Sequence, residues 1–217
     1  MENYIKGIKI AFAGAETTLI ITGIAVIIGI VIGFLVAVGK TSQIKIVKGI
    51  ATCYVDVLRG TPLLVQALLL YSGVPMILQA YHITFRWEEP IVAGIIACGI
   101  NSSAYVGEII RGGLKAVDKG QIEAAKSIGM NGFQRMRLIV APQAFKIVVP
   151  SLGNEFVTLI KETAVLSAIT IEEITRKSML WSAATFKAWP AYVGTAICYM
   201  ILTIPLSKII ERFEHRE

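Results

Sequence analysis

The feature that most restricts the fold is an uncharged apolar stretch of 23 residues, from 17 to 39. About 20 apolar residues in helical form cross the hydrocarbon core of a bilayer, so this stretch predicts a transmembrane helix. The composition agrees, because 55% of the residues are hydrophobic and 17% are charged, whereas soluble domains carry about 25% charged residues. We therefore expect an all-α, polytopic membrane protein.

Four further stretches extend this pattern to five predicted spans. Pro62 and Pro75 limit the second span, and the fourth span contains Glu155, Lys161 and Glu162. At 217 residues, the whole chain, 1–217, is expected to form a single transmembrane domain. The predicted spans are residues 17–39, 51–72, 90–111, 147–171 and 188–210.

The distribution of basic residues predicts the orientation. If the N-terminus lies outside, the inner segments 40–59, 111–146 and 208–217 hold 14 lysines and arginines, and the outer segments hold 6. The positive-inside rule then places the N-terminus outside, the C-terminus in the cytoplasm and the loop 112–142 in the cytoplasm. It also explains the net charge of +6, so no nucleic-acid partner is expected.

The cytoplasmic loop contains a short polar helix bounded by glycines. Asp118 is expected as its N-cap, with Gln121 three residues later in capping-box position, and Gly129 is expected to end it. Its middle is rich in alanine and lacks a broad apolar face. We therefore expect this helix to dock in a groove of another protein rather than to lie in lipid.

The sequence Glu123-Ala124-Ala125, followed after three further residues by Gly129, resembles the EAA loop of permease subunits of bacterial ABC importers. Four other stretches are similar to the subfamily that imports polar amino acids: DVLRGTPLLVQ (56–66), NSSAYVGEIIRGG (101–113), APQAF (141–145) and PSLGNEFVTLIKET (150–163). Ala141 stands where the family usually has leucine. The positions that match the EAA pattern are Glu123, Ala124, Ala125, Gly129, Ile139 and Pro142.

The resemblance implies the type I ABC importer permease fold and a location in the bacterial cell membrane. It implies a coupling helix in which Glu123, Ala124, Ala125 and Gly129 contact a separate ATPase. The implied partners are a pair of ATPase subunits that hold ATP and Mg²⁺, a second permease subunit, and an extracytoplasmic amino-acid-binding protein. The second permease subunit is either an identical copy or a close relative.

No cofactor is expected in this chain, and it is not expected to be an enzyme. The stretch GFLVAVGKT (33–41) resembles a phosphate-binding loop, but it has five residues between its glycines where the motif needs four. The cysteines and histidines are widely spaced and indicate no metal site. The energy for transport must then come from a partner or from an ion gradient.

Polar side chains inside the predicted spans are costly to insert, so they usually face a cavity or a partner. In the fourth span, Glu155, Thr158 and Glu162 share one helical face, and in the third span Asn101 and Tyr105 have the same spacing. Glu108, Arg111 and Arg59, near the cytoplasmic face, are expected to be paired internally, with Arg59 bonded to Asp56 or Glu108. The predicted substrate-binding residues are Gln66, Asn101, Tyr105, Asn154, Glu155, Thr158, Lys161 and Glu162.

Two acids against one lysine in the fourth span favour a cationic amino acid such as arginine, histidine or lysine. Together with the function that the resemblance implies, this predicts the membrane-spanning subunit of an ATP-driven ABC importer, which forms an alternating-access path for polar, preferably basic, amino acids. An alternative for the same polar residues is mutual pairing without a substrate. Other functions are a self-sufficient ion-coupled carrier or channel, which five spans without a repeat disfavour, and an intramembrane enzyme.

Overall fold

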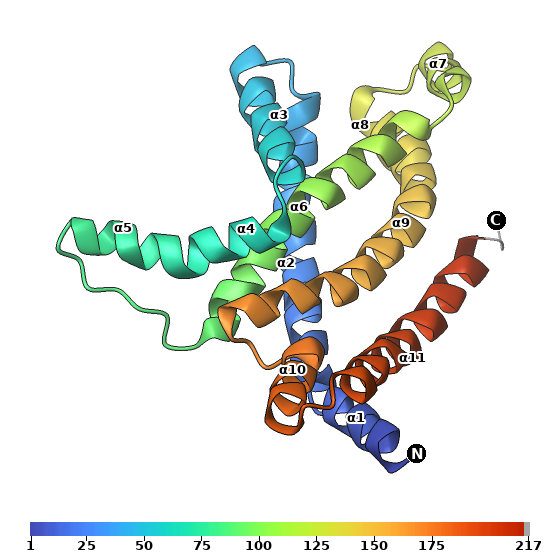
Figure 1. The fold of residues 1–217 in the computed structure, drawn as a ribbon. Helices are drawn as coiled ribbons and strands as arrows, with labels where there is room; N and C mark the ends of the chain where they lie inside the picture. The colour runs from blue at the N-terminus through green and yellow to red at the C-terminus, as the bar shows by residue number, and fades with distance from the viewer. Residues whose placement is uncertain (215–217) are drawn as a thin grey trace.

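The computed structural model describes residues 1–214, and every regular element in that part of the chain is helical (Figure 1). This confirms the predicted all-α class. The elements are α1 (Glu2–Phe12), α2 (Ala15–Thr41), α3 (Lys45–Arg59), α4 (Leu63–Leu68), a π-helical turn (Leu69–Gly73), α5 (Val74–Ala80), α6 (Pro90–Ala116), α7 (Lys119–Ser127), α8 (Gly132–Arg135), a second π-helical turn (Met136–Val140), α9 (Ala141–Glu162), a 3₁₀ helix (Thr163–Ile169), α10 (Ile174–Thr185) and α11 (Ala188–Glu214).

The centre of the fold is the packing of α2 against α6. A stripe of small residues on α2 allows this close approach. A Cβ atom added to Gly33 would lie 2.9 Å from the carbonyl oxygen of Ser103, and one added to Gly29 would lie 3.0 Å from Oγ of Ser102. Small residues let membrane helices pack backbone to backbone. The stripe is buried within the chain, and its members are Ala25, Gly29, Gly33 and Ala37.

The predicted second span, residues 51–72, is divided between two helices. α3 ends at Arg59 and α4 begins at Leu63. Pro62 causes the break, because it has no N–H to donate and its ring keeps the preceding residue out of helical geometry. The sequence pattern extended the apolar stretch through this proline, and that boundary needs correction.

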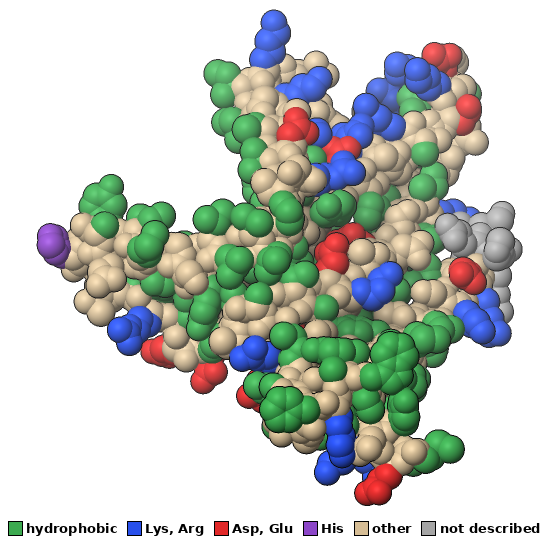
Figure 2. Space-filling model, in the orientation of Figure 1, with side chains coloured by type: hydrophobic (Ala, Val, Ile, Leu, Met, Phe, Trp, Pro, Cys, Tyr) green, Lys and Arg blue, Asp and Glu red, His purple; other side chains and the backbone are tan. Residues whose placement is uncertain are grey.

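The helix after the break continues farther than expected. Pro75 lies inside it, because the π-helical turn Leu69–Gly73 precedes the proline and widens the backbone spiral there. The resulting stretch, Leu63–Ala80, extends away from the rest of the molecule and carries exposed apolar side chains (Figures 1 and 2).

Four helical stretches among the described residues are long and apolar enough to cross a membrane. α9, which forms most of the predicted fourth span, carries Glu155, Lys161 and Glu162 and is not one of them. Its crossing, and with it the five-span topology, therefore stays a prediction. The four stretches are Glu2–Thr41, Leu63–Ala80, Pro90–Ala116 and Ala188–Phe213.

Two short helices, α1 and α10, were not expected, and both pack against α11 (Figure 1). α1 crosses α11 closely, since a Cβ atom at Gly194 would lie 2.4 Å from the carbonyl carbon of Gly7. α10 is capped by the buried Glu173, whose carboxylate accepts hydrogen bonds from the backbone N–H of Thr175 at 2.8 Å and of Arg176 at 2.7 Å.

Candidate functional site

The break between α3 and α4 is polar, although it lies beside the core helix α6. A broken helix leaves carbonyl groups without partners, and such groups need partners where water is absent. At the end of α3, the carbonyl of Asp56 accepts from Gly60 N at 2.9 Å, and the carbonyl of Val57 accepts from Thr61 Oγ1 at 2.8 Å. The sequence thus provides the partners that keep the break in place.

A cavity of about 340 Å³ opens at this break. It is bounded by the break itself, by the middle of α6 and by the last residue of α9. Its volume lies in the range of small-molecule sites, about 300–1,000 Å³. The lining residues are Arg59, Gly60, Thr61, Pro62, Leu63, Asn101, Tyr105 and Glu162.

The cation of the cavity is Arg59, which the sequence analysis did not place in the site. Its guanidinium carbon lies 5.2 Å from the centre of the Tyr105 ring, a cation–π distance. No ion pair with Asp56 or Glu108 is recorded among the described residues, so the expected pairing of Arg59 was wrong. The signal available in the sequence was an arginine directly before the break-forming Gly-Thr-Pro.

The anion of the cavity is Glu162, at the end of α9. Within residues 1–214 its carboxylate makes no recorded hydrogen bond or ion pair. Glu155 differs, because its Oε1 accepts a hydrogen bond from Ser102 Oγ at 2.8 Å and it does not line the cavity. The two acids of the predicted site therefore have different surroundings.

The structure brings three of the eight predicted residues together around the cavity: Asn101, Tyr105 and Glu162. Gln66 lies behind them, where its side-chain oxygen accepts from Asn101 Nδ2 at 3.1 Å. The other three predicted residues of α9 are exposed and do not line this cavity; these are Asn154, Thr158 and Lys161.

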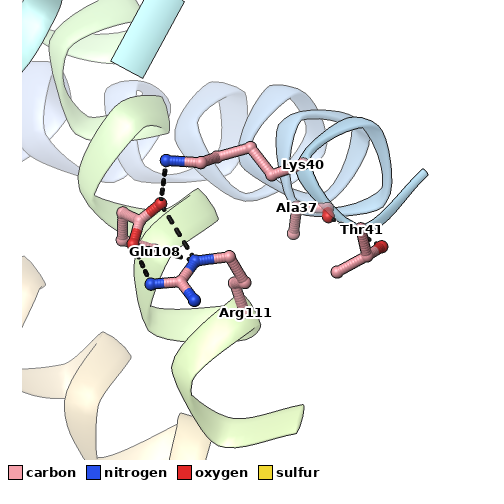
Figure 3. Close-up of polar contacts among 5 residues, drawn as sticks. All are labelled: Ala37, Lys40, Thr41, Glu108 and Arg111. Atoms are coloured by element: carbon pink, nitrogen blue, oxygen red, sulfur yellow. Dashed lines mark hydrogen bonds and ion pairs between the residues drawn. The ribbon is translucent and has the colours of Figure 1, made fainter. Parts of the chain in front are cut away.

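A second polar cluster lies nearer the ends of α2 and α6 (Figure 3). Lys40 Nζ is 2.6 Å from Glu108 Oε1, and Arg111 Nε donates to Glu108 Oε2 at 3.0 Å. Arg111 Nη2 is also bonded to the same carboxylate. The expected internal pairing of Glu108 and Arg111 is confirmed, and Lys40 is its additional member.

The predicted short polar helix is α7. Asp118 caps it, since its Oδ1 accepts from Gln121 N at 3.0 Å, and Gly129 follows it with a φ of 84°, the left-handed conformation of a helix stop. The reciprocal half of the capping box is not recorded, because Gln121 Oε1 instead accepts from Gln143 Nε2 at 2.6 Å. The predicted cap and stop are otherwise confirmed.

The surface of this loop differs in part from the expectation. Ala125 is 4% exposed, so it packs within the chain rather than facing a partner. Two large apolar side chains are exposed instead: Ile128 is 79% exposed and Phe133 is 72% exposed. The alanine-rich pattern of the helix gave no reason to single out these two residues. Glu123, Ala124 and Gly129 are exposed, as docking would require.

No group of three or more potential metal ligands occurs in the part of the chain that the structure describes. The three cysteines are free: Cys53 is exposed, and Cys98 and Cys198 are buried. What the geometry offers is a polar cavity with one cation and one anion, and an exposed loop with apolar side chains. These two features are the candidate substrate path and the candidate docking site.

Comparisons with known proteins identify similar permeases. The nopaline transport system permease of Agrobacterium fabrum is 36% identical over 201 residues, which are 91% of this chain and 83% of that protein. The glutamine transport system permease of Escherichia coli K12 is 32% identical over 209 residues, which are 96% of this chain and 93% of that protein.

A solved structure, described as an amino acid ABC transporter with histidines, is 41% identical to this chain. It superposes with a TM-score of 0.89 and covers 98% of this chain and 96% of that one. The fold is therefore that of ABC importer permeases. Residues 29–217 match the family model of the binding-protein-dependent transport system inner membrane component, and the chain belongs to this family.

Proposed function

We propose that this chain forms the translocation path of an ATP-driven importer for polar amino acids, with a preference for basic ones. The observation that carries the proposal is the cavity at the α3–α4 break, where the carboxylate of Glu162 makes no recorded hydrogen bond or ion pair within residues 1–214. The names of the similar permeases, for glutamine and nopaline, favour an amino acid or a derivative of one.

The chemistry of the cavity matches an amino acid with a second cationic group. The Glu162 carboxylate would bind an ammonium or guanidinium, and the Arg59 guanidinium would bind the α-carboxylate. The ring of Tyr105, over which the Arg59 guanidinium lies, would hold Arg59 in position. Glu155, a second acid on the same face of α9, would add to the negative potential and so to the preference for cations.

The exposed polar residues of α9 are assigned to the same path. Asn154, Thr158 and Lys161 would meet the substrate where this chain faces a second permease subunit. That subunit would be an identical copy or a close relative, and it would also cover part of the apolar Leu63–Ala80 stretch. An extracytoplasmic amino-acid-binding protein would deliver the substrate.

Coupling to ATP is assigned to the cytoplasmic loop. Glu123, Ala124 and Gly129 would enter a groove of the ATPase, with Ile128 and Phe133 as the apolar contacts. ATP and Mg²⁺ would be held by a pair of such ATPase subunits. Movement of this loop would then open the path alternately to the two sides of the membrane.

The proposed topology has five spans in the inner membrane. The N-terminus would lie outside and the C-terminus in the cytoplasm, although residues 215–217 lie outside the described part of the chain. α9 would be the fourth span, with Glu162 facing the cavity and Glu155 bonded to Ser102 instead of facing lipid.

Equilibrium binding of labelled arginine to the purified complex, with its ATPase, tests the substrate assignment. Glu162→Gln should weaken arginine binding about tenfold or more, because a charge-assisted hydrogen bond contributes about 1.5–3 kcal/mol. Glu88→Gln, at an exposed site outside the cavity, is the matched control and should bind as the wild type does. Unchanged binding by Glu162→Gln would remove Glu162 from the site.

Co-purification tests the class of transporter. An ATPase should co-purify with this chain, and uptake should require ATP. Arginine uptake by the chain alone, driven by an ion gradient, would instead identify a self-sufficient carrier.

A further inference from the structure

We propose that Gln66 is a positioning residue that turns the amide of Asn101 so that its oxygen, not its nitrogen, faces the substrate cavity. Gln66 would thereby favour cationic substrates without touching them. The inference rests on the proposed function for its substrate class, but the hydrogen bonds that support it do not depend on that function.

The first step concerns the nitrogen of the Gln66 side chain. Nε2 lies 2.9 Å from the carbonyl oxygen of Leu58 and 3.1 Å from that of Thr61. It also lies 2.9 Å from Thr61 Oγ1. Leu58 stands in the last turn of α3, so one side chain on α4 bonds to both sides of the helix break. The amide of Gln66 therefore links α3 to the segment that follows the break.

The second step fixes the orientation of this amide. Carbonyl oxygens only accept hydrogen bonds, so the NH₂ group of Gln66 must be the side that faces Leu58 and Thr61. Oε1 then points the other way, where it accepts from Asn101 Nδ2 at 3.1 Å. A reversed Gln66 amide would place its oxygen against two carbonyl oxygens, which excludes it.

The third step carries the orientation to Asn101. Because Gln66 presents an acceptor, Asn101 must present its NH₂ group to Gln66, and its Oδ1 is directed elsewhere. Asn101 is 3% exposed and lines the cavity, and Oδ1 makes no recorded hydrogen bond within residues 1–214. The chain of contacts from Leu58 through Gln66 thus leaves Asn101 with a free acceptor at the cavity.

The consequence is a difference in substrate preference. A cavity that presents Asn101 Oδ1 and the Glu162 carboxylate offers two acceptors to an ammonium or guanidinium group. Without the constraint from Gln66, the Asn101 amide can turn over and offer two N–H donors. Those donors would bind a substrate with an additional carboxylate, so the preference for cationic over anionic substrates would decrease.

Gln66→Leu and Gln66→Glu separate the two roles of the side chain. Leucine removes both the donors to the break and the acceptor for Asn101. Glutamate keeps an acceptor for Asn101 but loses the donors to Leu58 and Thr61. Gln79→Leu is the matched control, since Gln79 is exposed on the same helical stretch and makes no recorded side-chain hydrogen bond within residues 1–214.

Transport by the reconstituted complex, with ATPase and binding protein, gives the first readout. Gln66→Leu should raise the KM for arginine about tenfold, as expected for a lost contact of about 1.4 kcal/mol, and should lower the ratio of arginine to glutamate uptake. Gln66→Glu should keep that ratio and lower mainly kcat. Gln79→Leu should match the wild type. A residue needed only for folding would reduce uptake of both substrates equally.

A spectroscopic distance gives a readout that does not depend on the substrate. Spin labels at Ile50→Cys on α3 and Ile77→Cys on α5, with the native cysteines replaced, report the geometry of the break. Gln66→Leu and Gln66→Glu should both broaden the distance distribution, and Gln79→Leu should not. An unchanged distribution with an unchanged uptake ratio in Gln66→Leu would overturn the inference. If the wild type prefers glutamate but the distribution still broadens, the proposed substrate fails and the role of Gln66 in the break stands.

Discussion

Nζ of Lys40 lies 2.6 Å from Oε1 of Glu108, which joins the last turn of α2 to α6 (Figure 3). Arg111 shares the same carboxylate from the next turn of α6. The side chains of Lys40 and Glu108 are only 14% and 16% exposed. A partly buried carboxylate with two cationic partners fixes the relative position of the two helices that form the centre of the fold.

Lys40→Ala should therefore lower the stability of the purified protein in detergent by about 1–3 kcal/mol, because it removes a hydrogen bond between charged groups. Lys45→Ala, at an exposed position on α3, should change stability by less than about 0.5 kcal/mol. Thermal unfolding curves provide the measurement. Equal midpoints for the two variants would show that the pair does not join the helices.

Gly129→Leu should leave the protein inserted in the membrane but abolish substrate-stimulated ATP hydrolysis. Gly129 has a φ of 84°, which costs a residue with a Cβ about 1–2 kcal/mol, so the end of α7 must rearrange. A Cβ atom there meets nothing within 4 Å, so the rest of the chain is undisturbed. Gly49→Leu, also in open space, is the control. Stimulated hydrolysis at the normal rate in Gly129→Leu would refute the docking of α7.

The stability of the α10–α11 corner should depend on pH through Glu173. Burial raises the pKa of this carboxyl, and hydrogen bonds from Thr175 and Arg176 offset part of the effect. The pKa of Glu173 is higher in the folded state than in the unfolded state. Its contribution to folding stability is therefore complete below its ordinary pKa near 4.5, and it is lost as the pH rises through the folded-state pKa.

Glu173→Gln should remove the pH-dependent contribution of this side chain to folding stability. The unfolding midpoint of the wild type, relative to that of the variant, should therefore decrease as the pH rises from about 4.5 through the raised pKa of Glu173 in the folded state. Glu172→Gln is the control, because Glu172 is exposed and paired with Lys177. Parallel curves for the wild type and Glu173→Gln over this range would contradict the buried carboxyl as the source.

The proposed topology predicts that Glu88→Cys and Lys126→Cys are labelled from opposite sides of the membrane. Both positions are exposed, one in the loop before α6 and the other on α7. In a background without native cysteines, a membrane-impermeant reagent should label only Glu88→Cys in intact cells. Labelling of Lys126→Cys from outside would reverse the orientation and remove α7 from the cytoplasm.

The sequence predicted those features that depend on local chemistry. The cap at Asp118 and the stop at Gly129 follow from backbone hydrogen bonding and from the conformational freedom of glycine, and both were correct. Pro62 was recognised as a residue that limits a helix. The apolar residues on either side of it nevertheless led to the prediction of a single span, whereas the structure has two helices. Local hydropathy does not show that a hydroxyl and an amide elsewhere can provide the partners a broken helix needs.

Features that depend on tertiary contacts could not be predicted in this way. The burial of Ala125 and the stacking of Arg59 on Tyr105 depend on which helix lies beside them. Gln66 was identified as polar and functional, but its partners include a backbone carbonyl eight residues away and a side chain on α6. The spacing of residues along the sequence does not predict such contacts.

The most direct test of the central claim is ATP-dependent uptake of labelled arginine and labelled glutamate by proteoliposomes that contain this chain, its ATPase and its binding protein. The carboxylate of Glu162 and the acceptor oxygen of Asn101 at the cavity predict that arginine uptake exceeds glutamate uptake and that Glu162→Gln reduces the difference. Glutamate uptake that exceeds arginine uptake in the wild type would contradict the assignment of a path for basic amino acids.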